Sequence, residues 1–94
     1  MRIMNVDGSQ IFECDYIERY TLSEQSDAVL VKAGYSNAAA TLGRYGNMNE
    51  AKDALAGIFQ ALNDHKESFI MPDSPSRHEQ QAIKDARTKR KGGS

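Results

Sequence analysis

The chain has 94 residues and a formal net charge of −1, with 39% hydrophobic and 27% charged residues. A chain of this length buries about 60–65% of the surface that it exposes when unfolded, which suffices for one modest core and predicts a single domain. No apolar stretch approaches the roughly 20 residues that cross a bilayer, so we expect no membrane partner. The first ten residues lack the apolar region of a signal peptide, so we expect a cytoplasmic protein.

The first half of the chain is predicted to form strands. Asp7 and Gly8 are a favoured pair for a two-residue hairpin turn, because both central residues of a type I′ turn need a positive φ. Apolar and polar residues then alternate, and a β-rich apolar run is followed by a turn and a further extended stretch. The alanines at positions 38–40 would also tolerate a helix. We expect strands at about residues 2–6, 10–14, 16–24, 28–33 and 38–45.

One helix is predicted after these strands, ending near His65. Asn47 can cap its start, and Glu50 stands three residues later to complete a capping box. Gly57 costs about 1 kcal/mol relative to alanine in mid-helix, and it would permit close packing on the sheet. Apolar residues recur at spacings of three and four, which predicts one face that seals the sheet. This stripe consists of Met48, Ala51, Leu55, Ile58 and Leu62, with Phe59 widening it.

The segment after the helix is expected to attach the chain to the core for the last time. Residues 68–71 end in three apolar residues, and Pro72 then removes a backbone donor and disfavours helical angles before it. We therefore predict one α+β domain over residues 1–74. Its architecture is a small antiparallel sheet of four or five strands with one amphipathic helix packed on one face.

Residues 75–94 are predicted to be a basic C-terminal tail, partly helical or disordered, in which Ser76 and Glu79 could cap a helix. Charge is distributed unevenly between the body and this tail. Residues 1–76 hold six Lys and Arg against eleven Asp and Glu, whereas residues 77–94 hold six against two. An acidic body with a basic tail is typical of a protein that acts through binding.

Three segments, "MRIMNVDG", "GRYGNMNEAKDALAGIFQAL" and "FIMPDS", resemble a family of short proteins encoded in Gram-positive bacterial genomes, their phages and their mobile elements. The resemblance covers residues 1–74 and leaves the tail outside. The family is largely uncharacterised, so the resemblance implies a genomic setting and a fold but no activity. The matching residues are Arg2, Ile3, Asp7, Gly8, Tyr45, Asn47, Ala51, Lys52, Phe69, Met71, Pro72 and Asp73.

Residues that could carry catalytic chemistry are few. No HExxH, GxSxG, Walker A or GxGxxG pattern occurs. The single cysteine, Cys14, lies among apolar residues and is expected to be a small buried side chain, because one thiol forms neither an internal disulfide nor a zinc cluster. His65 and His78 lie in polar contexts. We therefore expect no enzyme, no cofactor and no metal site, and a small enzyme is the least favoured of three functions.

The first candidate site is an acidic strand face. Five carboxylates crowd into residues 13–27, and tyrosine is enriched at binding hot spots. Such a face can dock on a basic groove that normally holds nucleic acid, whereas the alternative is an exposed polar face that only keeps the protein in solution. The predicted protein-binding residues are Glu13, Asp15, Tyr16, Glu18 and Tyr20. The leading hypothesis is a non-enzymatic accessory protein of a phage or mobile element that binds a host or phage protein, such as an anti-CRISPR-like inhibitor of a nucleic-acid-processing or defence enzyme.

The second candidate site is the basic tail. Its cations would contact phosphates with a salt-dependent affinity, but the tail has no aromatic residue on which bases could stack. Contact with an acidic protein surface, or no specific role, are the alternatives. The predicted nucleic-acid-binding residues are Arg77, Lys84, Arg87, Lys89, Arg90 and Lys91, and the alternative function is a small nucleic-acid-binding regulator. An exposed edge strand would also allow a homodimer.

Overall fold

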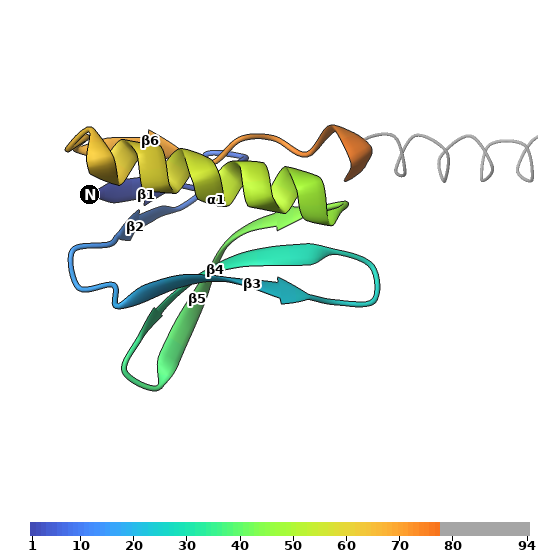
Figure 1. The fold of residues 1–94 in the computed structure, drawn as a ribbon, viewed down its shortest axis with the longest axis horizontal. Helices are drawn as coiled ribbons and strands as arrows, with labels where there is room; N and C mark the ends of the chain where they lie inside the picture. Colours follow the sequence, from blue (N-terminus) through green and yellow to red (C-terminus); the bar gives the residue numbers. More distant parts are fainter. Residues whose placement is uncertain (78–94) are drawn as a thin grey trace, which may run out of the picture.

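The structure, a computed structural model, describes residues 1–77. Strands and a helix follow one another along these residues (Figure 1). The elements are β1 (Arg2–Met4), β2 (Ile11–Glu13), β3 (Arg19–Glu24), β4 (Val29–Tyr35), β5 (Ala38–Tyr45), α1 (Met48–Asn63) and β6 (Ser68–Ile70). The first two strands are shorter than expected, whereas the later elements lie close to where the sequence predicts them.

The strands form two sheets of three, which corrects the prediction of a single antiparallel sheet of four or five. One sheet has the order β2-β1-β6, and the other has the order β3-β4-β5. β1 lies between β2, which is antiparallel to it, and β6, which is parallel to it. Both edges of β1 are therefore occupied, and a turn at Asp15 and Tyr16 leads the chain away from β2. β3 then begins a separate, fully antiparallel sheet.

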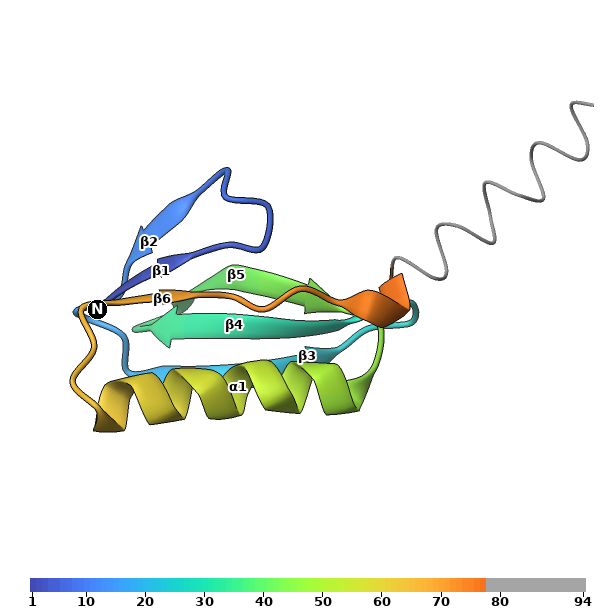
Figure 2. The ribbon, with the colours of Figure 1, turned by 90° about the horizontal axis from the view of Figure 1, so that it is seen from above.

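The two sheets and the helix form two layers. Figures 1 and 2 show α1 and the β2–β1–β6 sheet side by side over the same face of the β3–β4–β5 sheet. The buried apolar side chains of all three belong to one core. No element of residues 1–77 covers the opposite face of the β3–β4–β5 sheet (Figure 1). The largest fully buried side chains are Tyr45, Ile3, Leu42, Ile58, Met71 and Val31.

The turn between β1 and β2 differs in type from the prediction. Gly8 has a φ of 74°, but Asp7 has no positive φ, so the turn is not of type I′. Asn5 and Gln10 close a longer loop instead. The Asn5 N–H donates to the Gln10 carbonyl at 3.0 Å, and the Gln10 N–H donates to the Asn5 side-chain oxygen at 3.1 Å. The Asp-Gly pair therefore indicated the hairpin correctly, while Asn5 sets the length of its loop.

The start of α1 confirms half of the predicted capping box. The Asn47 side chain accepts a hydrogen bond from the Glu50 N–H at 2.9 Å. The Glu50 carboxylate does not return to the Asn47 backbone but binds Ser74 and Ser76 near the C-terminal end of the described chain. At the other end, Lys66 N–H donates to the Ala61 carbonyl at 2.9 Å, which satisfies an otherwise unpaired helix carbonyl.

The face of α1 that seals the sheet matches the predicted stripe only in part, because Ala51 and Ile58 are buried as predicted but the other large apolar residues are not. Leu62 is 43% exposed and Phe59 is 65% exposed, and Leu55 is only half-buried. Small side chains allow the helix to approach the sheet closely, and the bulky residues are then displaced to the flank of the helix. The buried residues of α1 are Ala51, Ala54, Ile58 and Ala61.

Gly57 permits the close packing that the sequence predicts, and its neighbour is β6. A Cβ atom placed on Gly57 would lie 2.8 Å from Cζ of Phe69, closer than carbon atoms approach without strain. Phe69 is half-buried, and Met71 is 2% exposed, whereas Ile70 between them is 65% exposed. Two of the three apolar residues at the end of the body therefore contact the core.

Residues 71–77, which we call the C-terminal strap, close over the start of α1. The Tyr45 hydroxyl donates to the Pro72 carbonyl at 2.8 Å. Ser74 is 3% exposed, and its hydroxyl accepts from the Gly46 N–H at 3.0 Å and donates to Glu50 at 2.9 Å. The Ser76 N–H and hydroxyl also donate to Glu50, at 3.0 and 2.6 Å. Residues 75–77 are helical, so the last described contacts with the body lie beyond the boundary predicted after Ser74.

Candidate functional site

An apolar groove, which we call the α1–β3 groove, runs between the flank of α1 and β3. Its volume is about 450 Å³. Phe59 and Leu62 border the groove and expose apolar surface there, whereas other residues of the same helix are buried in the core. An apolar hollow on the surface of a small protein is a candidate binding site. The groove is lined by Tyr20, Lys52, Leu55, Ala56, Ile58, Phe59 and Leu62.

The groove lies beside a strand edge with free hydrogen-bonding groups. β3 is the edge strand of its sheet, and the Gln25 N–H donates to the Ala28 carbonyl at 2.7 Å where β3 turns into β4. Hydrogen-bonded and non-bonded pairs alternate along an antiparallel ladder. In this register the odd-numbered residues of β3 bond to β4, and Tyr20, Leu22 and Glu24 direct their N–H and C=O groups away from the sheet.

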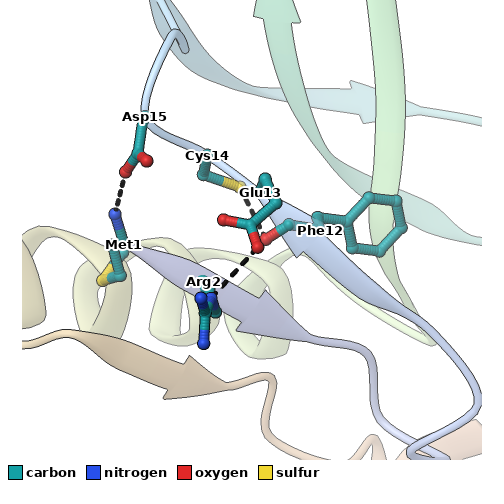
Figure 3. A network of polar contacts seen from close by, with 6 residues as sticks. All are labelled: Met1, Arg2, Phe12, Glu13, Cys14 and Asp15. Carbon is teal, nitrogen blue, oxygen red and sulfur yellow. Dashed lines mark hydrogen bonds and ion pairs between the residues drawn. The ribbon is translucent and has the colours of Figure 1, made fainter.

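The predicted acidic residues do not form an unopposed negative face, as Figure 3 shows for two of them. The Arg2 Nε donates to Glu13 at 3.0 Å. The N-terminal ammonium of Met1 donates to Asp15 at 2.6 Å. This hydrogen bond holds the pKa of Asp15 below its usual value and raises the pKa of the ammonium. Both carboxylates are therefore paired with cations of their own chain.

The remaining predicted residues separate from one another. Glu18 accepts from the Ser36 N–H at 3.2 Å and forms an ion pair with Arg19 at 3.6 Å. Tyr16 lies in the turn after β2 and is 88% exposed. Tyr20 lines the α1–β3 groove, so only this member of the predicted set belongs to it.

Tyr20 and Cys14 are neighbours, and neither is arranged for catalysis. Burial, followed by the proximity of Cys14, raises the pKa of Tyr20 to about 12. Burial likewise raises the pKa of the Cys14 thiol, which donates to the Phe12 carbonyl at 3.7 Å (Figure 3). A thiol with a raised pKa is a poor nucleophile, in agreement with the small buried side chain expected at this position.

The face of the β3–β4–β5 sheet that points away from α1 carries cations that the sequence analysis did not single out. Val29, Val31 and Ala33 are buried, so the residues that alternate with them face outward. The alternation of apolar and polar residues along β3 and β4 already indicates which of their side chains point outward. For β5 the sequence is not enough, because the bulge beside Val31 and Lys32 changes which of its side chains point outward. The outer face, as we call it, consists of Arg19, Thr21, Ser23, Leu30, Lys32, Gly34, Ala39, Thr41 and Arg44.

Of the predicted basic site, only Arg77 belongs to the described residues. Its Nη1 donates to the Arg44 carbonyl at 3.5 Å, which places the start of the tail at the end of β5. The other predicted residues lie outside the described part of the chain, namely Lys84, Arg87, Lys89, Arg90 and Lys91.

Within residues 1–77, no group of three or more His, Cys, Asp or Glu side chains could hold a metal ion. None of the helices described is long and apolar enough to cross a membrane. No protein-family model, no curated protein and no solved structure matches the chain. The resemblance to short proteins of Gram-positive bacteria and their phages therefore stays a prediction.

Proposed function

We propose that this chain is a non-enzymatic binding protein that takes up an extended segment of a partner protein on the edge of β3. The observation that carries the proposal is the position of the α1–β3 groove beside that edge. Tyr20 and Leu22 offer N–H and C=O groups there, and their side chains pack toward the core under α1. A strand that adds to a sheet edge gains affinity from backbone hydrogen bonds and specificity from pockets for its alternate side chains.

The apolar flank of α1 supplies the pockets. Burying apolar surface stabilises a complex by about 25 cal/mol per Å², and aromatic side chains dominate such contacts. Phe59 is largely exposed at 65% and Leu62 is partly exposed at 43%, and the two follow each other at a spacing of three on the same helix. The apolar surface that they leave exposed is available to a partner segment.

The ends of β3 specify the chemistry of the partner segment. Arg19 lies at one end of the strand and Glu24 at the other, and both are exposed. Opposite charges on facing strands stabilise a pairing, and like charges destabilise it. The favoured segment therefore has an acidic residue beside Arg19 and a basic residue beside Glu24. Its apolar residues occupy alternate positions, because alternate side chains of a strand share one face.

The resemblance stated from the sequence supplies a setting. The protein would be a cytoplasmic accessory factor of a phage or mobile element, and its partner a host or phage protein such as a nucleic-acid-processing or defence enzyme that it inhibits in an anti-CRISPR-like manner. The α1–β3 groove replaces the acidic strand face in this role. Glu13, Asp15 and Glu18 are each paired with a cation of the same chain, which weakens the field that they present to a partner.

A second candidate function is nucleic-acid binding by the basic residues from Arg77 onward. The observation in its favour is that Arg77 lies beside Arg44, so that the basic segment of the sequence begins next to a cation of the body. Residues 77–94 hold six Lys and Arg against two Asp and Glu, and such a charge density binds phosphates in a salt-dependent manner.

The strand-addition proposal is tested by selecting binders from a displayed library of linear peptides and mapping them on the labelled full-length chain by NMR. We expect selected peptides to carry apolar residues at alternate positions. Their binding should protect the amides of Tyr20, Leu22 and Glu24 from hydrogen exchange, whereas Thr21 and Ser23 already donate to β4 and should change little.

Phe59→Ser should weaken the selected peptides by about tenfold or more, as expected for an aromatic hot spot. Ile70→Ser is the matched control, because Ile70 is equally exposed at 65% but lies on β6. Failure to select any binder, or equal binding by the two variants, would contradict the proposal. Protection of the same amides in the peptide-free protein as its concentration rises would instead identify a second copy of the chain as the occupant.

A further inference from the structure

We propose that the outer face of the β3–β4–β5 sheet binds the phosphate groups of nucleic acid. This site lies on the opposite side of the sheet from α1 and does not depend on the α1–β3 groove. It also extends the nucleic-acid-binding hypothesis from the C-terminal tail to the folded body of the protein.

The sheet register brings one cation from each strand to the outer face. Lys32 on β4 is paired with Thr21 on β3 and with Thr41 on β5. Arg19 belongs to the row of pairs on one side of Lys32, and Arg44 belongs to the row on the other side. With strands about 4.8 Å apart and a rise of about 3.3 Å per residue, successive Cα atoms along this diagonal are roughly 8 Å apart. The three cations therefore form a line across the sheet.

Lys32, at the centre of this line, has no competing partner. Among residues 1–77, the ion pairs involve the Met1 ammonium and three arginines, and no carboxylate lies within ion-pair distance of Lys32. Hydroxyl groups of Thr21 and Thr41 flank it in the same row and can donate to phosphate oxygens, as Ser and Thr do in nucleic-acid complexes.

Arg19 and Arg44 each have one exposed carboxylate partner that phosphate can replace. Arg19 pairs with Glu18 at 3.6 Å, and Arg44 pairs with Asp27 at 3.3 Å. All four side chains are about half or more exposed, and exposed ion pairs contribute about 0–1 kcal/mol. The Arg19 side chain also lies flat on the sheet, because a Cβ atom on Gly34 would be 3.0 Å from its Nε. It is therefore already placed on the outer face.

Arg77 extends the line of cations toward the tail. Its guanidinium reaches the Arg44 carbonyl, and both residues border a groove of about 470 Å³ beside β5. Asp7 and Asp73 also line that groove, so its charge is mixed. The outer face is consequently the better phosphate site. The groove is not part of this site and lies between Arg44 of the outer face and Arg77.

The side chains of the outer face specify the kind of contact. The face presents ammonium, guanidinium and hydroxyl groups and no aromatic ring among its residues. Stacking on single-stranded bases therefore has no platform there. Contacts to the phosphate backbone of a duplex need only such donors, and they position a protein without reading sequence.

The test measures fluorescence anisotropy of labelled duplexes of about 20 base pairs, one of DNA and one of RNA, with the full-length chain at several salt concentrations. Lys32→Glu should weaken binding on the order of tenfold and reduce the slope of log affinity against log salt by about 1. Lys66→Glu makes the same charge change at an exposed residue after α1, and it should leave both values nearly unchanged.

A gain of affinity provides a second readout that misfolding cannot imitate. Asp27→Asn removes the carboxylate that competes for Arg44, and it should tighten binding by about two- to fivefold, since an exposed pair contributes at most about 1 kcal/mol. Combining it with Arg44→Gln should abolish this gain.

The proposal is overturned if neither duplex binds at low salt, or if Lys32→Glu and Lys66→Glu weaken binding equally. It is also overturned if binding is lost on reversing Lys89, Arg90 and Lys91 but is insensitive to Lys32→Glu and Asp27→Asn, because the tail alone would then be the site. None of these outcomes involves Phe59, so failure here leaves the strand-addition function standing.

Discussion

The strands of the β3–β4–β5 sheet have six to eight residues, whereas each strand of the β2–β1–β6 sheet has three. The longer sheet is built by two hairpins between neighbours in sequence. The shorter sheet joins residues 2–4 to residues 68–70, which α1 and the longer sheet separate. Pairing between neighbours in sequence is therefore enough to build the β3–β4–β5 sheet. The β2–β1–β6 sheet is complete only when α1 has brought β6 back to β1.

This difference explains where stabilising contacts concentrate. Two short ladders do not hold a sheet on their own, and the β2–β1–β6 sheet is accordingly supported from outside. Phe69 packs on Gly57 of α1, and Tyr45 of β5 binds the strap that follows β6. The β3–β4–β5 sheet needs no such support on its far side, which leaves the outer face and the edge of β3 available for binding.

The largest expected effect comes from Ile3→Ala in β1. Ile3 is fully buried and belongs to the same core as Val31 and Ile58, so its truncation should lower the free energy of unfolding by about 2–5 kcal/mol. Urea unfolding measures this cost. Ile11→Ala, at a residue of β2 that is 57% exposed, should cost about 0.5 kcal/mol or less. Equal costs would show that the short sheet is not part of the common core.

A smaller effect is expected from Tyr45→Phe, which removes one contact between β5 and the strap. The Tyr45 hydroxyl donates to the Pro72 carbonyl at 2.8 Å, and a hydrogen bond of this kind contributes about 1 kcal/mol. The unfolding free energy should fall by that amount, with increased hydrogen exchange at Met71 and Ser74. Unchanged exchange in the strap would show that Tyr45 does not hold it.

The smallest effect is expected from Glu50→Gln, which removes a stabilisation that is present above about pH 4.5, so the difference from the native chain shrinks at acidic pH. Burial opposes ionisation of Glu50, but hydrogen bonds from Ser76 and Ser74 outweigh it and hold its pKa below the usual value of 4.5. A lowered pKa stabilises the fold above the usual value, and this stabilisation is lost as the pH falls from about 4.5 through the folded-state pKa. Melting temperatures measured from about pH 6 to about pH 3 should therefore fall less steeply in the variant.

Glu67→Gln removes the same charge outside this network and is the control for Glu50→Gln. It should retain the acid sensitivity of the native chain. If both variants behave like the native chain, Glu50 does not anchor the strap through its ionised form.

Local signals in the sequence were reliable where a residue acts on its immediate neighbours. Asn47 caps α1 because its side chain needs only the N–H of Glu50, and Asp7 and Gly8 lie in a hairpin loop because the chain must reverse there. The helix stripe was correct for Ala51 and Ile58 but wrong for Leu62, because periodicity restricts which residues share a face but not which of two adjoining faces packs. Alanines and larger apolar residues both recur at helical spacing, and the close approach of α1 selected the alanines.

By itself, the sequence determined the α+β class, the hairpins, the helix and its cap, because these depend on backbone preferences over a few residues. Tertiary structure alone decided the division into two sheets, since the parallel pairing of β1 with β6 joins the ends of the body. It also decided which side chains are left for binding. Phe59 is exposed because α1 lies close to the sheet on its small side chains. Arg19, Lys32 and Arg44 lie together because of the strand register. Neither the distance between helix and sheet nor the register can be read from a short stretch of sequence.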